Sequence, residues 1–142
     1  MNKHIYPSLL IDGIDRYAQH QAWMYSKGYT PDQRVDLTGV EQVRLVCQGA
    51  DLTGAYLRGA ILIYANLSGA SLRDANLNGV NLRGANLDRA NICGASLRSA
   101  NLYGAGLYGT DLQDANLFDV DLRGANLINA TFFKGRVWGD SQ

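Results

Sequence analysis

The feature that most constrains this chain is a five-residue repeat that runs without a gap from Ala50 to Lys134. This stretch divides into consecutive units such as ANLSG, ANLNG and VDLRG, seventeen in all. The central residue of each unit is Leu, except where Ile92 and Phe132 replace it. The first residue is Ala except at Val80, Thr110 and Val120. Any fold proposed for this chain must therefore place every fifth residue in the same environment.

Neither regular secondary structure does this. Five residues turn about 500° in an α-helix, so successive leucines would spread around its axis. In a continuous strand the side chains alternate with period two, so an odd spacing would send each Leu to the opposite face. A chain that runs extended for about three residues and then turns, once in every unit, keeps the leucines together.

This geometry assigns a role to each position of the repeat. The first and central residues are two apart in the extended part, so both point inward. The second, fourth and fifth residues point outward or form the corner, and Gly or Asp in fifth place suits a tight turn. The second residue is mostly Asn, Asp or Ser, whose short side chains can bond to nearby backbone. Stacked coils would pair their backbones at about 4.8 Å per layer.

The tandem A(N/D)LXX pattern resembles the pentapeptide-repeat family, and the resemblance covers Ala50 to Lys134. It implies an all-β fold, a right-handed quadrilateral parallel β-helix (a solenoid) with four pentapeptides per coil. Seventeen units would then form a little over four coils, about 20 Å tall at the layer spacing.

The solenoid is predicted to extend over residues 35–134. Residues 35–39 (VDLTG) share the phase of the later units, but residues 40–44 (VEQVR) break the pattern, and LVCQG restores it imperfectly. Residues 35–49 are therefore interpreted as an irregular first coil. Cys47 occupies a Leu position there, which predicts a small core side chain.

The two ends are predicted to be caps, because the open end of a solenoid exposes core and unpaired strand edges. Residues 1–34 form one cap, with an α-helix over about residues 9–27 that begins after Ser8 and ends before Gly28. Residues 135–142 form a C-terminal tail or cap. The apolar side chains expected to plug the last coil are Phe132, Phe133, Val137 and Trp138.

The composition argues against catalysis. A narrow interior filled by Ala and Leu leaves no room for a cofactor or substrate. His4 and His20 are the only histidines and lie far along the chain from Cys93, an outward thiol. No metal-site or phosphate-loop motif occurs. We therefore expect a non-enzyme without cofactor or metal.

The charges and cysteines bear on the partner and the compartment. Lys plus Arg and Asp plus Glu are both 13, so nucleic-acid binding is not expected. No apolar stretch is long enough for a signal peptide or a membrane span. Two cysteines are too few for a disulfide framework. The expected location is the cytoplasm.

Outward residues one coil apart should stack in columns on the faces of the solenoid. One column contains Arg83, Tyr103 and Arg123, and the next contains Tyr108. Arg and Tyr are enriched at protein interfaces, so these four residues are the candidate partner-binding patch. The alternative is a solvated face whose long side chains cover backbone, with Tyr103 stacked between two guanidinium groups.

A second candidate surface is apolar. It comprises Tyr56, Ile61, Ile63 and Tyr64, where the polar second position is lost in two successive units. An exposed apolar patch of this kind needs a cover. The N-terminal helix or an external partner would provide it.

Together these features predict a rigid protein-binding scaffold or regulatory adaptor, because solenoids present broad, ordered surfaces. The resemblance implies members in cyanobacteria that are similar to regulators of cell differentiation. It also implies the alternative, a DNA mimic that binds or protects gyrase, typically a long acidic rod dimerised through its C-terminal aromatic units. Here the repeat carries seven Asp against six Arg and one Lys. A monomer and an end-to-end homodimer both remain open.

Overall fold

The computed structural model describes residues 36–133 and the backbone of residues 136–137. The expected N-terminal helix and Trp138 lie outside these residues, as do His4 and His20.

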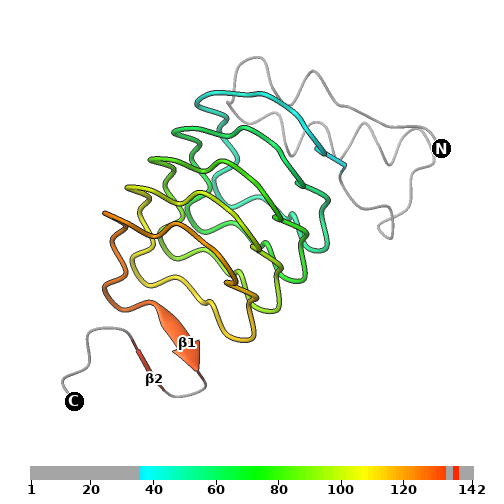
Figure 1. Cartoon of the computed structure of the whole chain (residues 1–142). Helices are drawn as coiled ribbons and strands as arrows, with labels where there is room; N and C mark the ends of the chain where they lie inside the picture. The colour runs from blue at the N-terminus through cyan, green and yellow to red at the C-terminus, as the bar shows by residue number, and fades with distance from the viewer. Residues whose placement is uncertain (1–35, 134–135, 138–142) are drawn as a thin grey trace.

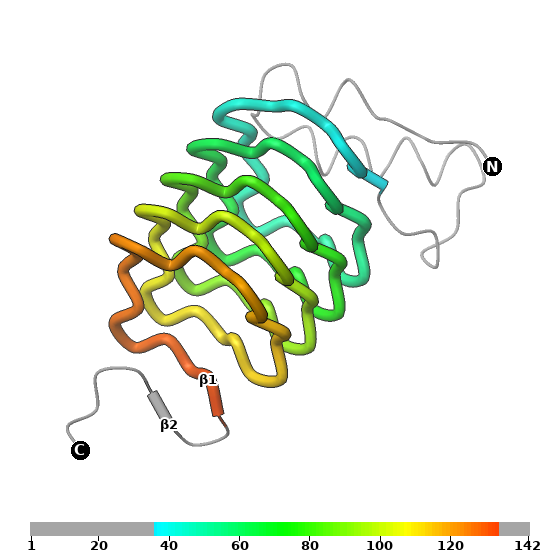
Figure 2. The backbone as a smooth tube through the Cα atoms, viewed as in Figure 1, coloured from blue at the N-terminus to red at the C-terminus, as the bar shows by residue number. Residues whose placement is uncertain are grey.

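The described chain winds into a stack of coils, and each turn of the stack takes four repeat units (Figures 1 and 2). Each second-position residue pairs in parallel with its equivalent four units later, from Asp36 with Tyr56 to Asp111 with Thr131. The pairs form four ladders, which define four faces. We call these face 1 (36 to 116), face 2 (41 to 121), face 3 (46 to 126) and face 4 (51 to 131). The four-sided parallel coil that the family resemblance implies is thus confirmed.

Each repeat unit turns a corner through a residue in the left-handed region. The fifth-position φ angles lie near +60°, for eleven glycines and for eight other residues that include Tyr64 and Arg89. The N–H of the next unit then donates to the central carbonyl, as from Ala85 to Leu82 at 3.0 Å. Glycine adopts this conformation without the penalty that a Cβ brings, which explains its frequency at the fifth position.

Hydrogen bonds between coils make the stack rigid. The Leu82 N–H donates to the Asn101 carbonyl at 2.8 Å, and the Gly84 N–H donates to the Tyr103 carbonyl at 2.9 Å. In the other direction the Asn81 N–H donates to the Ala60 carbonyl at 2.8 Å. These three bonds repeat in all units from residue 60 to residue 109, which have a coil on both sides, and they pair most of the backbone there.

The first and central side chains fill the interior, as predicted. Most are fully buried, and Cys47 packs among them with 2 % of its surface exposed. Burial raises the pKa of the Cys47 thiol to about 11. The one polar side chain buried among the described residues is Thr110, whose hydroxyl donates to the Leu87 carbonyl at 2.7 Å.

The first coil follows the same ladder as the later ones. The Gln42 N–H donates to the Ile61 carbonyl at 2.7 Å, and Arg44 has the corner φ of 62°. Gln42 occupies a central position but is only partly buried, whereas the leucines at the equivalent positions of the middle coils are fully buried. The irregularity of residues 40–44 therefore affects the side chains and leaves the backbone path intact.

The chain reverses its direction at the C-terminal end of the stack. Strand β1 (Thr131–Phe133) pairs antiparallel with β2 (Arg136–Val137), so the chain reverses after the last ladder (Figure 1). Phe132 packs against the core, as predicted, but Phe133 is 71 % exposed. Phe133 takes a fourth position, which points outward, so the expectation that it plugs the last coil is wrong. The structure does not describe the side chains of Val137 and Trp138.

Candidate functional site

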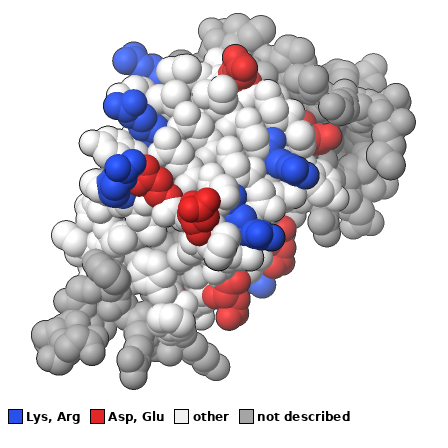
Figure 3. Space-filling model, viewed as in Figure 1, with Lys and Arg blue, Asp and Glu red and all other residues white. Residues whose placement is uncertain are grey.

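The fourth-position side chains stand in columns on the outer surface, one residue from each coil. In the space-filling view, basic and acidic side chains are scattered over a mostly uncharged face (Figure 3). The column on face 2 contains Ile63, Arg83, Tyr103 and Arg123, because its ladder joins residues 61, 81, 101 and 121. The columns expected from the sequence are therefore present in the structure.

Three of the four residues of the candidate patch are in contact. The Arg83 guanidinium carbon lies 5.4 Å from the centroid of the Tyr103 ring, and that of Arg123 lies 5.9 Å from it. The ring is therefore flanked by two cations from the adjacent coils. Cation–π attraction holds these three exposed side chains in a defined arrangement.

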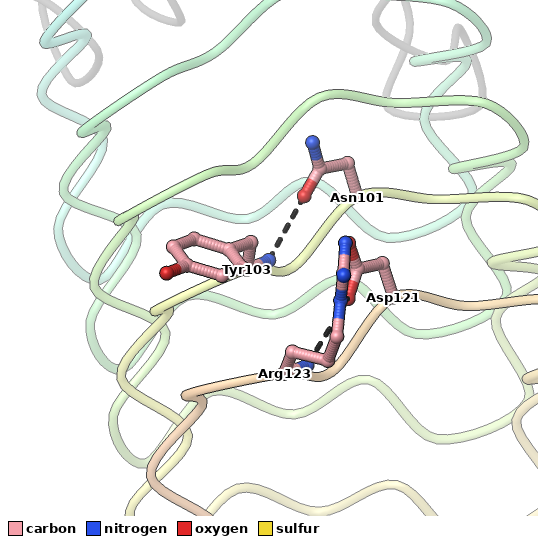
Figure 4. Close-up of polar contacts among 4 residues, drawn as sticks. All are labelled: Asn101, Tyr103, Asp121 and Arg123. Atoms are coloured by element: carbon pink, nitrogen blue, oxygen red, sulfur yellow. Dashed lines mark hydrogen bonds and ion pairs between the residues drawn. The ribbon is translucent and has the colours of Figure 1, made fainter.

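Polar contacts orient this stack further (Figure 4). Arg123 forms a two-point ion pair with Asp121, with Nε 2.9 Å from Oδ1 and Nη2 2.7 Å from Oδ2. The Asp121 carboxylate also accepts the Arg123 backbone N–H at 3.1 Å. These hydrogen bonds to Arg123 lower the pKa of Asp121 to about 2. On the adjacent coil the Asn101 side chain accepts the Tyr103 N–H at 2.9 Å.

Tyr108, the fourth residue of the candidate patch, lies in the column of face 3. The guanidinium carbon of Arg89 lies 5.9 Å from its ring centroid, and Asp88 accepts its backbone N–H at 2.9 Å. The patch thus consists of the Arg83–Tyr103–Arg123 stack and a separate Arg89–Tyr108 pair on the neighbouring column.

Sequence reasoning did not identify Asp121 and Arg89 as parts of these contacts. The signal for Asp121 was present, because the second and fourth residues of the unit VDLRG both point outward. A third pair, Arg98 over Phe118 at 5.5 Å on face 1, was also missed. Arginine beside an aromatic residue one coil away is therefore a recurrent feature of this surface.

The second candidate surface lies near the first coils, on faces 1 and 2. Tyr56 and Tyr64 are exposed, at 43 % and 54 %, whereas Ile61 and Ile63 are partly buried. The Tyr64 ring packs over Gly84 of the next coil so closely that a Cβ there would clash with the ring. Tyr64 is thus held against the solenoid at the edge of this patch.

The outer surface offers grooves. One of about 510 Å³ lies along Arg58, Asn78 and Arg98, and one of about 420 Å³ lies along Ser68, Asp88 and Tyr108. Among the described residues, no three His, Cys, Asp or Glu side chains gather as a metal site requires. No helix within that part of the chain is long and apolar enough to cross a membrane.

A family model described as pentapeptide repeats matches residues 44–79, 75–114 and 115–133, in eight copies. No curated protein matches the chain.

Solved structures of similar proteins include some from cyanobacteria and one from a plant. A pentapeptide repeat protein of Cyanothece 51142 is 38 % identical over 75 % of this chain, with a TM-score of 0.47. HetL of Nostoc sp. strain PCC 7120, involved in heterocyst differentiation regulation, is 35 % identical over 77 %, with a TM-score of 0.35. A thylakoid lumen protein of Arabidopsis thaliana is 30 % identical over 74 %, with a TM-score of 0.48. The matches span 65 %, 45 % and 70 % of those three chains.

Proposed function

Because this chain belongs to the pentapeptide-repeat family, we propose that it is a non-catalytic scaffold or regulatory adaptor that binds a protein partner through its outer faces. The observation that carries the proposal is the Arg83–Tyr103–Arg123 stack. Its side chains are exposed but already ordered, so binding them costs little conformational entropy. Buried Arg and Tyr side chains supply much of the affinity at protein interfaces.

The interior supports the non-catalytic part of the proposal. Ala and Leu side chains fill it, and both open grooves lie outside. At the grooves of the described residues a substrate would therefore meet an open surface, where water screens charges and is not excluded from a reaction. Such a surface suits recognition better than chemistry.

A pull-down from a lysate of the source organism tests the proposal. The purified chain is compared with the double variant Arg83→Glu/Tyr103→Ala, which breaks the stack. The matched control is Arg73→Glu/Gln113→Ala, two fourth-position residues of face 4. Loss of a hot-spot pair should weaken partner binding by about 30-fold or more. A partner retained by wild type and control but lost by the stack variant supports the proposal.

A partner retained equally by all three proteins would contradict the role of the stack. The alternative, mimicry of DNA toward gyrase, needs rows of carboxylates along a face. The central column of face 2 instead presents Arg83, Tyr103 and Arg123, with Asp121 paired to Arg123. Inhibition of gyrase supercoiling by the purified protein would replace our proposal with this alternative.

A further inference from the structure

An open groove of about 510 Å³ runs along face 1 at its corner with face 2. Three successive coils line it in the same way, each through its fourth and fifth residues. These are Arg58 and Gly59, Asn78 and Gly79, and Arg98 and Ser99. At about 4.8 Å per coil, the two arginine positions are about 10 Å apart. The groove therefore has a cationic residue toward each end and small polar residues between them.

These two arginines form no ion pair within the described chain, where the one ion pair joins Arg123 to Asp121. Residues 52–64, 75–87 and 95–110 include the parts of faces 1 and 2 around the groove, and they contain no Asp or Glu. In the next coil on the C-terminal side, Asp119 accepts the Ser99 hydroxyl at 3.2 Å. The lining of the groove therefore carries two cationic residues and no carboxylate, with Asp119 beyond its C-terminal end.

The floor of the groove adds a directed donor. The Asn78 side-chain oxygen accepts hydrogen bonds from the backbone N–H of Arg98 at 3.0 Å and from the Ser96 hydroxyl at 2.6 Å. Because the oxygen faces these donors, the amide nitrogen of Asn78 remains to donate to a ligand. Arg98 packs its guanidinium over the Phe118 ring at 5.5 Å, which limits its motion. The site thus offers two guanidinium groups with an amide donor between them.

We propose that this groove binds carboxylate side chains of an acidic, extended segment of the partner protein. The inference rests on the function proposed above and specifies the chemistry of the partner. Carboxylates accept two parallel hydrogen bonds from a guanidinium group, which makes them a good match for arginine. An extended segment rises about 3.3 Å per residue, so two acidic residues at positions i and i+3 would span the two arginines.

Two features favour this ligand and this site over the others. A nucleic acid would gain most from a large basic excess, and the chain carries equal numbers of cationic and anionic residues. The other groove contains Asp88 beside Arg89, so a second carboxylate there would be repelled. The groove beside Arg58 and Arg98 is therefore the site for an acidic peptide.

Fluorescence anisotropy with a labelled glutamate heptapeptide tests the inference. We expect wild type to bind this peptide, more weakly as salt rises, and to ignore a glutamine heptapeptide. The variant Arg58→Gln/Arg98→Gln should bind at least about tenfold more weakly, because charge-assisted hydrogen bonds are lost. Arg73→Gln on face 4 is the matched control and should bind as wild type. Circular dichroism melting checks that every variant folds.

Three results would overturn the inference: no binding of the glutamate peptide by wild type, equal binding by the double variant, or tighter binding of a single-stranded DNA heptamer. The proposed function is tested separately. If the pull-down identifies a partner lost by the stack variant while the glutamate peptide fails, the scaffold proposal stands and only the acidic segment is wrong. If the peptide binds but no partner depends on the stack, the groove remains an acidic-peptide site and the role of the stack in partner binding is wrong.

Discussion

The carboxylate of Asp88 accepts the backbone N–H of Tyr108 from the next coil, at 2.9 Å. In most units this fourth-position N–H bonds to the side chain two residues earlier, as Tyr103 does to Asn101. Tyr108 has Gly106 at that place, which offers no side chain. Asp88 therefore replaces the missing local acceptor from the neighbouring coil.

Replacing Asp88 by Ala should destabilise the solenoid by about 1 kcal/mol, because the Tyr108 N–H loses its acceptor. Urea denaturation measures the change, and Gln113→Ala serves as a surface control. A second change, Gly106→Asn, should restore stability in the Asp88→Ala background by supplying the usual acceptor. In the wild-type background the same change should not help, since its Cβ would lie 2.8 Å from the Asp88 carboxylate. Full stability of Asp88→Ala alone would contradict this account.

Gly84→Ala should destabilise the chain more than Gly79→Ala. Both glycines have a φ of +65°, so both substitutions carry the left-handed penalty of about 1–2 kcal/mol. A Cβ at Gly79 meets nothing within 4 Å, whereas one at Gly84 would force the Tyr64 ring away. We expect an additional cost of about 1 kcal/mol, measured by urea denaturation. In the Tyr64→Ala background the two glycine substitutions should cost the same, and a persistent difference would argue against the ring contact.

The two cysteines should differ sharply toward a thiol reagent. Cys47 is buried, and its pKa of about 11 leaves almost no thiolate near neutral pH. Cys93 is partly exposed. Native protein should therefore release one equivalent of chromophore from Ellman's reagent, and unfolded protein two. Cys93→Ser should abolish the native signal. Rapid reaction of two thiols in the folded state would show that the first coil opens.

The Asp121 carboxyl should titrate with a pKa of about 2. The chemical shift of its carboxyl carbon, measured by NMR as the pH is lowered, reports this pKa. Its pKa is lowered in the folded state, so the pair with Arg123 stabilises the fold above the ordinary pKa of 3.8 that the carboxyl has in the unfolded chain. This contribution is lost as the pH falls through about 2 and is constant near neutrality. Arg123→Gln should raise the midpoint toward the ordinary value. An unchanged midpoint in that variant would assign the shift to another cause.

The repeat predicted the fold because every unit follows the same rule. The alternation of small and large apolar residues placed Ala85 and Leu82 in the core, and the family resemblance implied four units per coil. Even Cys47 was assigned correctly, because its place in the repeat counts for more than its chemistry. The exposed Phe133 was misassigned because its aromatic character was weighed above its position in the repeat.

The site was predicted less completely, because the contacts of an outward side chain depend on its length and rotamer. Stacking outward residues one coil apart placed Tyr103 between Arg83 and Arg123, and the structure confirms this arrangement. It did not reveal that Asp121 turns toward Arg123, or that a fifth-position residue, Arg89, contacts the Tyr108 ring. These contacts depend on side-chain rotamers, which a consensus pattern does not contain.

The period of four units per coil also limits how such a chain can change its length. Insertion or deletion of a single unit would rotate all later units by a quarter revolution. Such a change between Arg83 and Tyr103 would therefore place the two residues on different faces. Duplication or loss of a whole coil would keep every column in line and merely lengthen or shorten it. Relatives that share the Arg83–Tyr103–Arg123 stack are therefore expected to differ in length by whole coils within the repeat, and a relative that differs by one unit there should have lost the stack.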